Sequence, residues 1–165
     1  MTANTLDSAM ALIYREAMYL DECRWADWLS LYTQECEYWM PMWKSEDERN
    51  ADPQTSLSHI YYAGKAGLSD RVARITSRKS PASRPLPRTS HVIGTGIVLD
   101  QHADSIVVRS AWCCHVVFPR HREAHAFFGS YRHELQREEG EWRIRNKHIV
   151  LLNDYIPTML DIYCV

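Results

Sequence analysis

The second half of the chain is a succession of long segments in which apolar and polar side chains alternate, and this feature constrains the fold most. Across residues 105–118 the apolar side chains occupy nearly every second position, while Arg109, Cys113 and His115 take the opposite phase. A period of two is typical of a strand with one buried face. Residues 125–136 and 141–152 read in the same way, and residues 90–99 form a further apolar segment with two glycines; turn signals separate these segments. The sequence therefore predicts an antiparallel meander of four strands.

The last of these segments makes the predicted alternation explicit. Along residues 141–152 the inward positions are expected to be Trp142, Ile144, Val150 and Leu152. The outward positions are expected to be Arg143, Arg145 and Lys147.

The first third of the chain predicts helices. Apolar residues repeat at helical spacing across residues 6–20, and a second, shorter repeat runs from Trp25 to Tyr32. Pro41 limits the β-prone segment 36–42 to an edge or to the end of a strand. Helices followed by a run of strands indicate an α+β domain, with the helices on one face of the sheet. Gly94 and Gly96 allow the sheet to curve strongly, which gives a cone that either holds a ligand or is filled by side chains.

Residues 57–91 are richer in tyrosine, arginine and proline than such a domain requires. Tyr61 and Tyr62 precede a predicted helix that ends near residue 75 and carries Arg71 and Arg74 on one face. A proline-rich arm, residues 80–88, follows and leads to Arg88. The basic side chains could bind phosphate or nucleic acid, or form a solvated helix face. Arginine beside tyrosine is enriched at protein interfaces, and this third interpretation fits best.

Bulk composition narrows the class of protein. The 165 residues suit one domain, residues 1–165. The net charge of −2 argues against a simple basic nucleic-acid binder. We find no apolar run long enough to span a bilayer and no secretion signal. Five scattered cysteines favour reduced thiols in a cytoplasmic protein.

Catalytic motifs are not evident. Cys113 and His115 form a C-x-H, the first half of a Rieske iron–sulfur motif, but the C-x-x-H half is absent. No nucleophile elbow, phosphate loop or dinucleotide fingerprint is present. A cone could still support proton transfer, and the candidate residues are Tyr14, Asp27, His91 and His148. For each of them a hydrogen-bonded structural role is the more common outcome.

A set of short motifs resembles the small (beta) subunit of aromatic-ring-hydroxylating dioxygenases of the benzoate and anthranilate 1,2-dioxygenase type. The set runs through Asp52-Pro53, Ile60-Tyr61-Tyr62, Gly67-Leu68, Asp70-Arg71-Val72, Arg74-Ile75, Pro87-Arg88-Thr89, His91, Leu151-Leu152-Asn153-Asp154, Leu160-Asp161 and Tyr163. The motifs are specific as a set and weak singly, and they extend over nearly the whole chain.

This resemblance implies a cystatin-like fold of the nuclear-transport-factor-2-like superfamily. It implies an alpha3beta3 hexamer whose large (alpha) subunit carries a Rieske [2Fe-2S] cluster and a mononuclear Fe(II). The assembled enzyme would cis-dihydroxylate an aromatic carboxylate with O2 and with electrons passed from NADH through a reductase. The small subunit would then be mainly structural, with no catalytic, cofactor-binding or metal-binding residue of its own.

Two hypotheses about this chain follow. Subunit contacts, including those of a trimer of this chain, are expected to involve Tyr61, Tyr62, Arg71, Arg74 and Arg88. The apolar tail, residues 156–165, either packs on a neighbour or folds back on its own sheet. Two alternative functions remain open, a free-standing dehydratase or isomerase with a His/Asp/Tyr pocket and a stand-alone binding module. An open pocket with such a pair would favour the enzyme, whereas a solid cone would favour the structural subunit.

Overall fold

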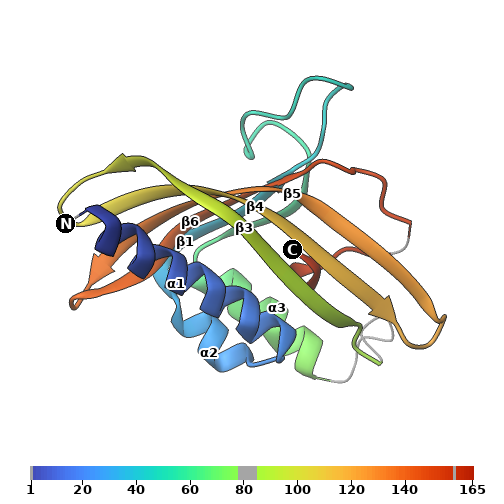
Figure 1. Ribbon diagram of the computed structural model, residues 1–165. Helices are drawn as coiled ribbons and strands as arrows, with labels where there is room; N and C mark the ends of the chain where they lie inside the picture. Colours follow the sequence, from blue (N-terminus) through green and yellow to red (C-terminus); the bar gives the residue numbers. More distant parts are fainter. Residues whose placement is uncertain (1, 78–84, 158) are drawn as a thin grey trace.

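In the computed structural model, one layer of helices lies against a single arched sheet (Figure 1). The structure describes residues 2–77, 85–157 and 159–165, with the side chains of residues 2–4 left aside. The helices are α1 Thr2–Asp21, α2 Trp25–Ser30 and α3 Lys65–Thr76. The strands are β1 Tyr32–Pro41, β2 Ser58–Ala63, β3 Arg88–Gln101, β4 Ser105–Phe118, β5 Glu123–Glu138 and β6 Glu141–Leu151, and a short 3-10 helix η2, Ile162–Cys164, follows. The α+β prediction is confirmed.

The strand order is β2-β1-β6-β5-β4-β3, and every neighbouring pair is antiparallel except β1 and β6. The predicted meander is therefore present as β3 to β6. β1 inserts beside β6 in parallel, so the first and last strands of the chain lie at the middle of the sheet. Pro41 ends β1, as expected for a residue that cannot donate to the ladder.

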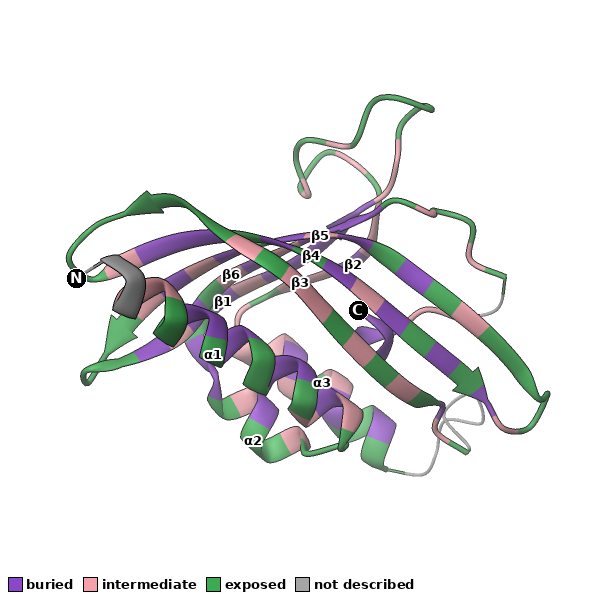
Figure 2. Cartoon of the chain, in the orientation of Figure 1, coloured by how far each residue is buried: buried purple, intermediate pink, exposed green. Residues whose placement is uncertain are grey.

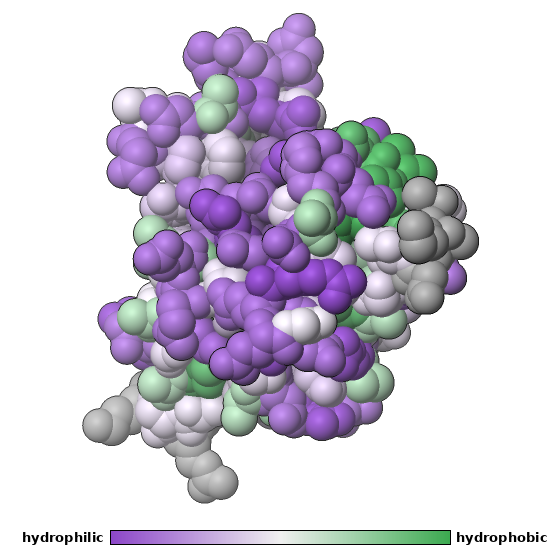
Figure 3. All heavy atoms as spheres, turned by 90° about the vertical axis from the view of Figure 1, so that its left-hand side faces the viewer, coloured by the Kyte–Doolittle hydropathy of each residue, from purple (hydrophilic) through white to green (hydrophobic). Residues whose placement is uncertain are grey.

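The helices cover one face of the sheet, which we call the inner face. Burial alternates along β4 and β5 as predicted, with Trp112, Phe127 and Tyr131 inside and Arg109 outside (Figure 2). α1 packs on β3 at Gly96, where a Cβ atom would lie only 2.3 Å from the Met10 sulfur. The end of the molecule seen in Figure 3 is covered mainly by hydrophilic residues, with one apolar patch.

The prediction for β6 holds from Trp142 to Arg145 and is wrong at Lys147 and Leu152. Glu134 pairs with Asn146 but Leu135 pairs with Ile144, so Arg145 is an extra residue in the ladder. A bulge of this kind exchanges the faces of all the residues that follow it. Lys147, expected outside, is 1% exposed, and Leu152, expected inside, is 55% exposed.

The second helix ends earlier than expected, and most of the proline-rich arm lies outside the described residues. The second helix ends at Ser30, and Tyr32 begins a strand. Most of the proline-rich arm falls in residues 78–84, which are outside the described residues, as are Arg78, Lys79 and Arg84. Among the described residues no helix is long and apolar enough to cross a membrane.

The tail folds back into the molecule. Residues 161–165 are all buried, and η2 packs against β4 beneath the arch of the sheet (Figure 1). The Tyr38 hydroxyl donates to a backbone oxygen of Val165 at 3.0 Å. The second of the two predictions for the tail is therefore observed for these five residues, and they help fill the cone.

Candidate functional site

The interior of the cone contains a buried cluster of charged and polar side chains around Glu16. This α1 residue is 1% exposed. Its Oε1 accepts hydrogen bonds from Trp28 Nε1 at 3.2 Å, the Tyr32 hydroxyl at 2.7 Å and Lys147 Nζ at 2.7 Å. His133 Nε2 lies 3.6 Å from the other carboxylate oxygen. α1, α2, β1, β5 and β6 thus converge on one carboxylate.

Electrostatics keeps this cluster ionised but neutral overall. Burial alone would raise the pKa of Glu16, yet the Lys147 charge and then His133 outweigh it and hold the pKa well below its ordinary range. Burial lowers the pKa of Lys147, and Glu16 acts against that change. A carboxylate that already accepts from three donors, one of them a cation, has little capacity left to take a proton from a substrate. The arrangement indicates a structural role.

Sequence reasoning missed Glu16, His133 and Lys147. One signal was available for Glu16, because it lies three residues after Ile13 and four before Leu20, on the apolar stripe of its helix. For Lys147 the bulge removes the signal, since a simple alternation places this residue outside.

A second, partly buried pair joins the end of α1 to the start of β3. His91 Nδ1 lies 2.6 Å from Asp21 Oδ1, and the His91 backbone N–H donates to Asp21 Oδ2 at 2.9 Å. Thr89 adds a hydroxyl donor at 2.8 Å. Burial would raise the pKa of Asp21, but these contacts with His91 and Thr89 lower it overall. The His91 side chain is 1% exposed.

The four candidates for proton transfer do not form one site. His91 has the Asp21 partner, which sequence reasoning missed. Asp27 pairs with Arg24 at 2.8 Å on the surface, and Tyr14 is 50% exposed on α1. His148 stacks on Trp39 with ring centroids 4.7 Å apart, on the outer face of the sheet.

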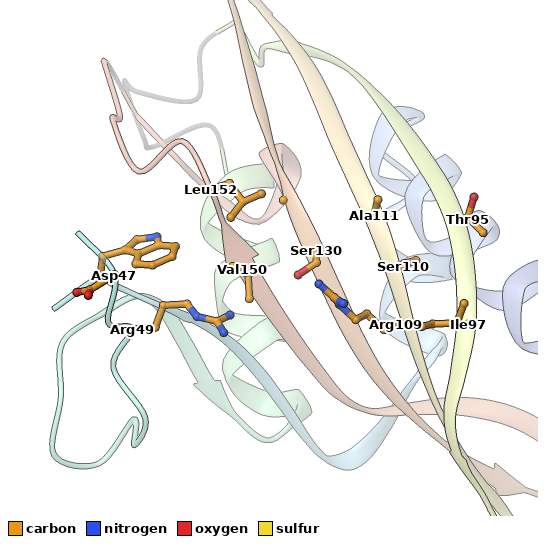
Figure 4. Close-up of a pocket in the computed structure, with 12 residues that line it drawn as sticks. Asp47, Arg49, Thr95, Ile97, Arg109, Ser110, Ala111, Ser130, Val150 and Leu152 are labelled. Carbon is orange, nitrogen blue, oxygen red and sulfur yellow. The ribbon is translucent and has the colours of Figure 1, made fainter. Parts of the chain in front are cut away.

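The open pockets lie elsewhere. The most prominent has a volume of about 600 Å³ and lies between the loop after β1 and the outer face of the sheet (Figure 4). Two others, of about 530 and 520 Å³, lie along the same loop. None of these three pockets of the described residues is lined by Glu16, His133 or His91. Inside the cone, Tyr38, Tyr131 and Lys147 are each at most 1% exposed, so side chains fill this part of the interior. A filled cone is the arrangement that would favour the structural subunit.

The five residues expected at subunit contacts do not share one surface. Tyr61 and Tyr62 are neighbours on β2 and point to opposite faces; Tyr61 contacts Gln54 and Glu37, whereas Tyr62 packs against Gly67 of α3. Arg71 is already paired with Asp161 within the chain, its Nε 2.9 Å from Oδ1. Arg74 and Arg88 are exposed.

The partial iron–sulfur motif gives only two neighbouring ligands. Cys113 and His115 share the outer face, with the sulfur 3.7 Å from Nε2, while Cys114 is buried on the inner face. In the described part of the chain no group of three or more His, Cys, Asp or Glu side chains is placed to hold a metal ion. Two ligands do not hold a cluster.

Comparison with known proteins gives a consistent family. The model described as the ring hydroxylating beta subunit matches residues 15–158. The chain is 35% identical to the benzoate 1,2-dioxygenase subunit beta of Acinetobacter baylyi, over 96% of this chain and 93% of that protein. It is 38% identical to the 2-halobenzoate 1,2-dioxygenase small subunit of Burkholderia cepacia, over 94% of this chain and 93% of that protein.

Solved structures agree on the fold. The crystal structure of the beta subunit of the benzoate 1,2-dioxygenase from Burkholderia mallei superposes with a TM-score of 0.80 at 32% identity, covering 97% of each chain. A candidate scytalone dehydratase of Novosphingobium aromaticivorans superposes with a TM-score of 0.71 at 14% identity, over 98% of this chain and 97% of that one. At that identity the likeness concerns the fold alone, and it agrees with the expected cone.

Proposed function

The chain belongs to the ring hydroxylating beta subunit family, and from this premise we propose that it is the structural small subunit of a dioxygenase that cis-dihydroxylates an aromatic carboxylate. The observation that carries the proposal is the filled cone. Where an enzyme of this fold class would need an open cavity, this chain has a neutralised Glu16–Lys147 pair and its own tail. The relatives named above are small subunits of dioxygenases acting on benzoate and 2-halobenzoate.

The partner is a large (alpha) subunit, in which we place the Rieske [2Fe-2S] cluster and the mononuclear Fe(II). Cys113 and His115 do not suffice for a cluster, and no chemistry is assigned to them. The complex is proposed to be an alpha3beta3 hexamer that receives electrons from NADH through a reductase. We propose that the chain forms one domain, residues 1–165. We also propose that it works in the cytoplasm, where its five free thiols would stay reduced.

Among the residues expected at subunit contacts, Arg74 and Arg88 suit that role best. Both are exposed and neither is paired with a carboxylate in the described structure. Tyr61 is half-buried on the opposite face from α3 and remains a candidate for a different contact. Tyr62 and Arg71 are engaged inside the chain and are proposed to act only indirectly, by holding α3 and the tail in place.

Co-expression with the large subunit tests the proposal. Native mass spectrometry is expected to give a complex with three copies of each chain. Charge reversal at both Arg74→Glu and Arg88→Glu is expected to weaken it by about tenfold or more, because like charges replace a complementary pair at an interface. Arg120→Glu, in the exposed turn after β4, is the matched control.

The outcomes separate two claims. A hexamer that tolerates both reversals removes Arg74 and Arg88 from the interface. Failure of the wild-type chain to bind any large subunit, with the fold confirmed by circular dichroism, overturns the proposed function itself.

The alternative of a free-standing dehydratase or isomerase is favoured by one observation, the Asp21–His91 pair. A carboxylate that orients an imidazole is the arrangement of a general base. That base has no access to substrate in the described structure, since His91 is 1% exposed. An oxygen-independent activity of the isolated chain that disappears in His91→Asn, with folding unchanged, would replace the structural proposal.

A further inference from the structure

The outer face of the sheet brings together arginines that form no ion pair with any acidic side chain of the described residues. The strand register places Ile97, Arg109, Arg132 and His148 side by side across β3, β4, β5 and β6. Arg109 and Arg132 are directly opposite each other on antiparallel strands. Like charges in that position destabilise a sheet, so this row calls for a compensating negative charge.

A third guanidinium reaches the same place from the loop after β1. Arg49 and Arg109 extend toward one another across the 600 Å³ pocket, and the Ser130 hydroxyl lies beside Arg109 (Figure 4). Two arginines and a hydroxyl on facing walls match the planar, bidentate recognition of a carboxylate.

Much of the remaining wall of the pocket is apolar, and Asp47, Thr95 and Ser110 are its other polar residues. Trp43, Ile97, Val150 and Leu152 line it, and the Trp43 ring is fixed because its Nε1 donates to the Leu151 carbonyl at 2.7 Å. An apolar pocket with a few convergent polar groups is typical of a small-molecule site, and the volume lies in the usual range.

Acidic side chains near the pocket are engaged with other partners. Asp47 lines the pocket but accepts a hydrogen bond from Ser45 at 2.8 Å. Glu134, on the same face of β5, accepts from Asn146 at 3.0 Å and lies 3.9 Å from Arg145. Within the described residues, Arg49, Arg109 and Arg132 form no ion pair with a carboxylate.

His148 is a nearby indicator of this positive charge. Burial first, and then the charges of Arg49 and Arg132, lower its pKa to about 4. The imidazole is therefore neutral at pH 7, and the positive charge near the pocket comes from the three guanidiniums.

We infer that the pocket between Arg49, Arg109 and Trp43 binds a small carboxylate with an apolar body, such as an aromatic acid. The carboxylate lies between the two guanidiniums, and the body lies against Trp43, Val150 and Leu152. This site goes beyond the proposed function and does not depend on it, because every residue involved belongs to this chain. Its occupation offsets the repulsion between Arg109 and Arg132 and so stabilises the sheet.

Thermal unfolding of the purified full-length chain with benzoate as the probe tests the inference. In the wild-type chain benzoate is expected to raise the Tm in a saturable way. Arg109→Gln is expected to raise the Tm without ligand, because it relieves the repulsion, and to weaken benzoate binding by about tenfold or more. Arg49→Gln is expected to weaken binding similarly, and Arg120→Gln, an exposed arginine away from the pocket, serves as the control.

Ligand controls distinguish the source of any effect. Benzamide, which lacks the charge, and acetate, which lacks the apolar body, are each expected to bind at least about tenfold more weakly than benzoate. If acetate or inorganic phosphate acts as well as benzoate, the site accepts any anion, including an acidic side chain of a partner subunit, and the inference is overturned. It is equally overturned if benzoate has no effect on the wild-type chain or the same effect on Arg109→Gln.

Discussion

At the scale of single residues, Glu16 and Lys147 dominate the interior. Each is 1% exposed, and the distance between Oε1 and Nζ is 2.7 Å. Removing two ions from water is costly, and only good geometry together with further hydrogen bonds offsets that cost. Trp28 and Tyr32 supply those bonds here. The pair as a whole therefore adds little net stability, but the loss of either partner alone is strongly destabilising.

A double-mutant cycle tests that requirement. Lys147→Met is expected to lower the free energy of unfolding by about 3–5 kcal/mol, because the Glu16 charge is left buried without its cation. The double variant Glu16→Gln/Lys147→Met is expected to lose much less. Urea denaturation at pH 7 measures both. Lys44→Met, which breaks the exposed Lys44–Glu48 pair, is the control and is expected to change stability by about 1 kcal/mol or less. Additive losses in the cycle would contradict this account.

Residue-level prediction from the sequence succeeded for apolar side chains and failed for buried polar ones. Trp112, Tyr131 and Phe127 follow the alternation that a half-buried strand imposes, so their positions were predictable. His91 was recognised as a candidate, but its partner Asp21 lies 70 positions away in the sequence. No local pattern links residues that meet only through the tertiary fold.

At the scale of elements, the link between α3 and the tail is the clearest long-range contact. Asp161 caps η2 through the Ile162 N–H at 2.8 Å and holds Arg71 with the same carboxylate. Asp161 is 4% exposed, whereas the Arg71 side chain is 25% exposed. The tail is therefore tied to α3, through a residue that lies 90 positions earlier in the sequence.

Breaking this link should loosen the tail. Arg71→Gln is expected to lower the free energy of unfolding by about 2 kcal/mol, less than for a fully buried pair because Arg71 is partly exposed. Hydrogen exchange of residues 162–165 should accelerate. Arg74→Gln, one turn further along the same helix and exposed, is expected to change stability by about 0.5 kcal/mol or less. Equal behaviour of the two variants would rule out a special role for Arg71.

Element types were predictable while their limits and faces were less so. The period of two predicted β4 to β6, an apolar segment with two glycines predicted β3, and the helical spacing predicted α1. Tyr32 continued the helical spacing of Trp25 and Trp28, yet it begins β1, because pairing with β6 overrides the local preference. The pocket of Arg49 and Arg109 was not predictable, since it forms only when the loop after β1 folds over the outer face of four strands, β3 to β6.

At the scale of the whole molecule, the carboxylates and histidines with shifted pKa values all lower the stability of the fold as the pH falls. Folding lowers the pKa of Glu16 and Asp21 below their ordinary values of 4.5 and 3.8. Burial also lowers the pKa of His59, His133 and His148 below the ordinary 6.5. In each case the unfolded chain binds protons more readily than the folded chain, so stability is lost as the pH falls.

The free energy of unfolding is therefore expected to decrease in two stages. Between pH 6.5 and about 4 the histidines titrate in the unfolded chain, and below 4.5 the carboxylates follow. Urea denaturation across this range measures the slope. His148→Gln should flatten the first stage and leave the second unchanged. A wild-type stability that is constant between pH 6.5 and 4.5 would contradict the assignment of these groups.

The bulge at Arg145 has a consequence for how this family of chains can vary in length. Because Arg145 is an extra residue, the alternation of inner and outer side chains along β6 shifts by one position at that point. Loss of Arg145 would remove the extra residue and leave a regular ladder with the same two faces, so that Lys147 stays inside and Leu152 stays outside. A single-residue deletion further along β6 would instead exchange the buried and exposed faces of the residues that follow it.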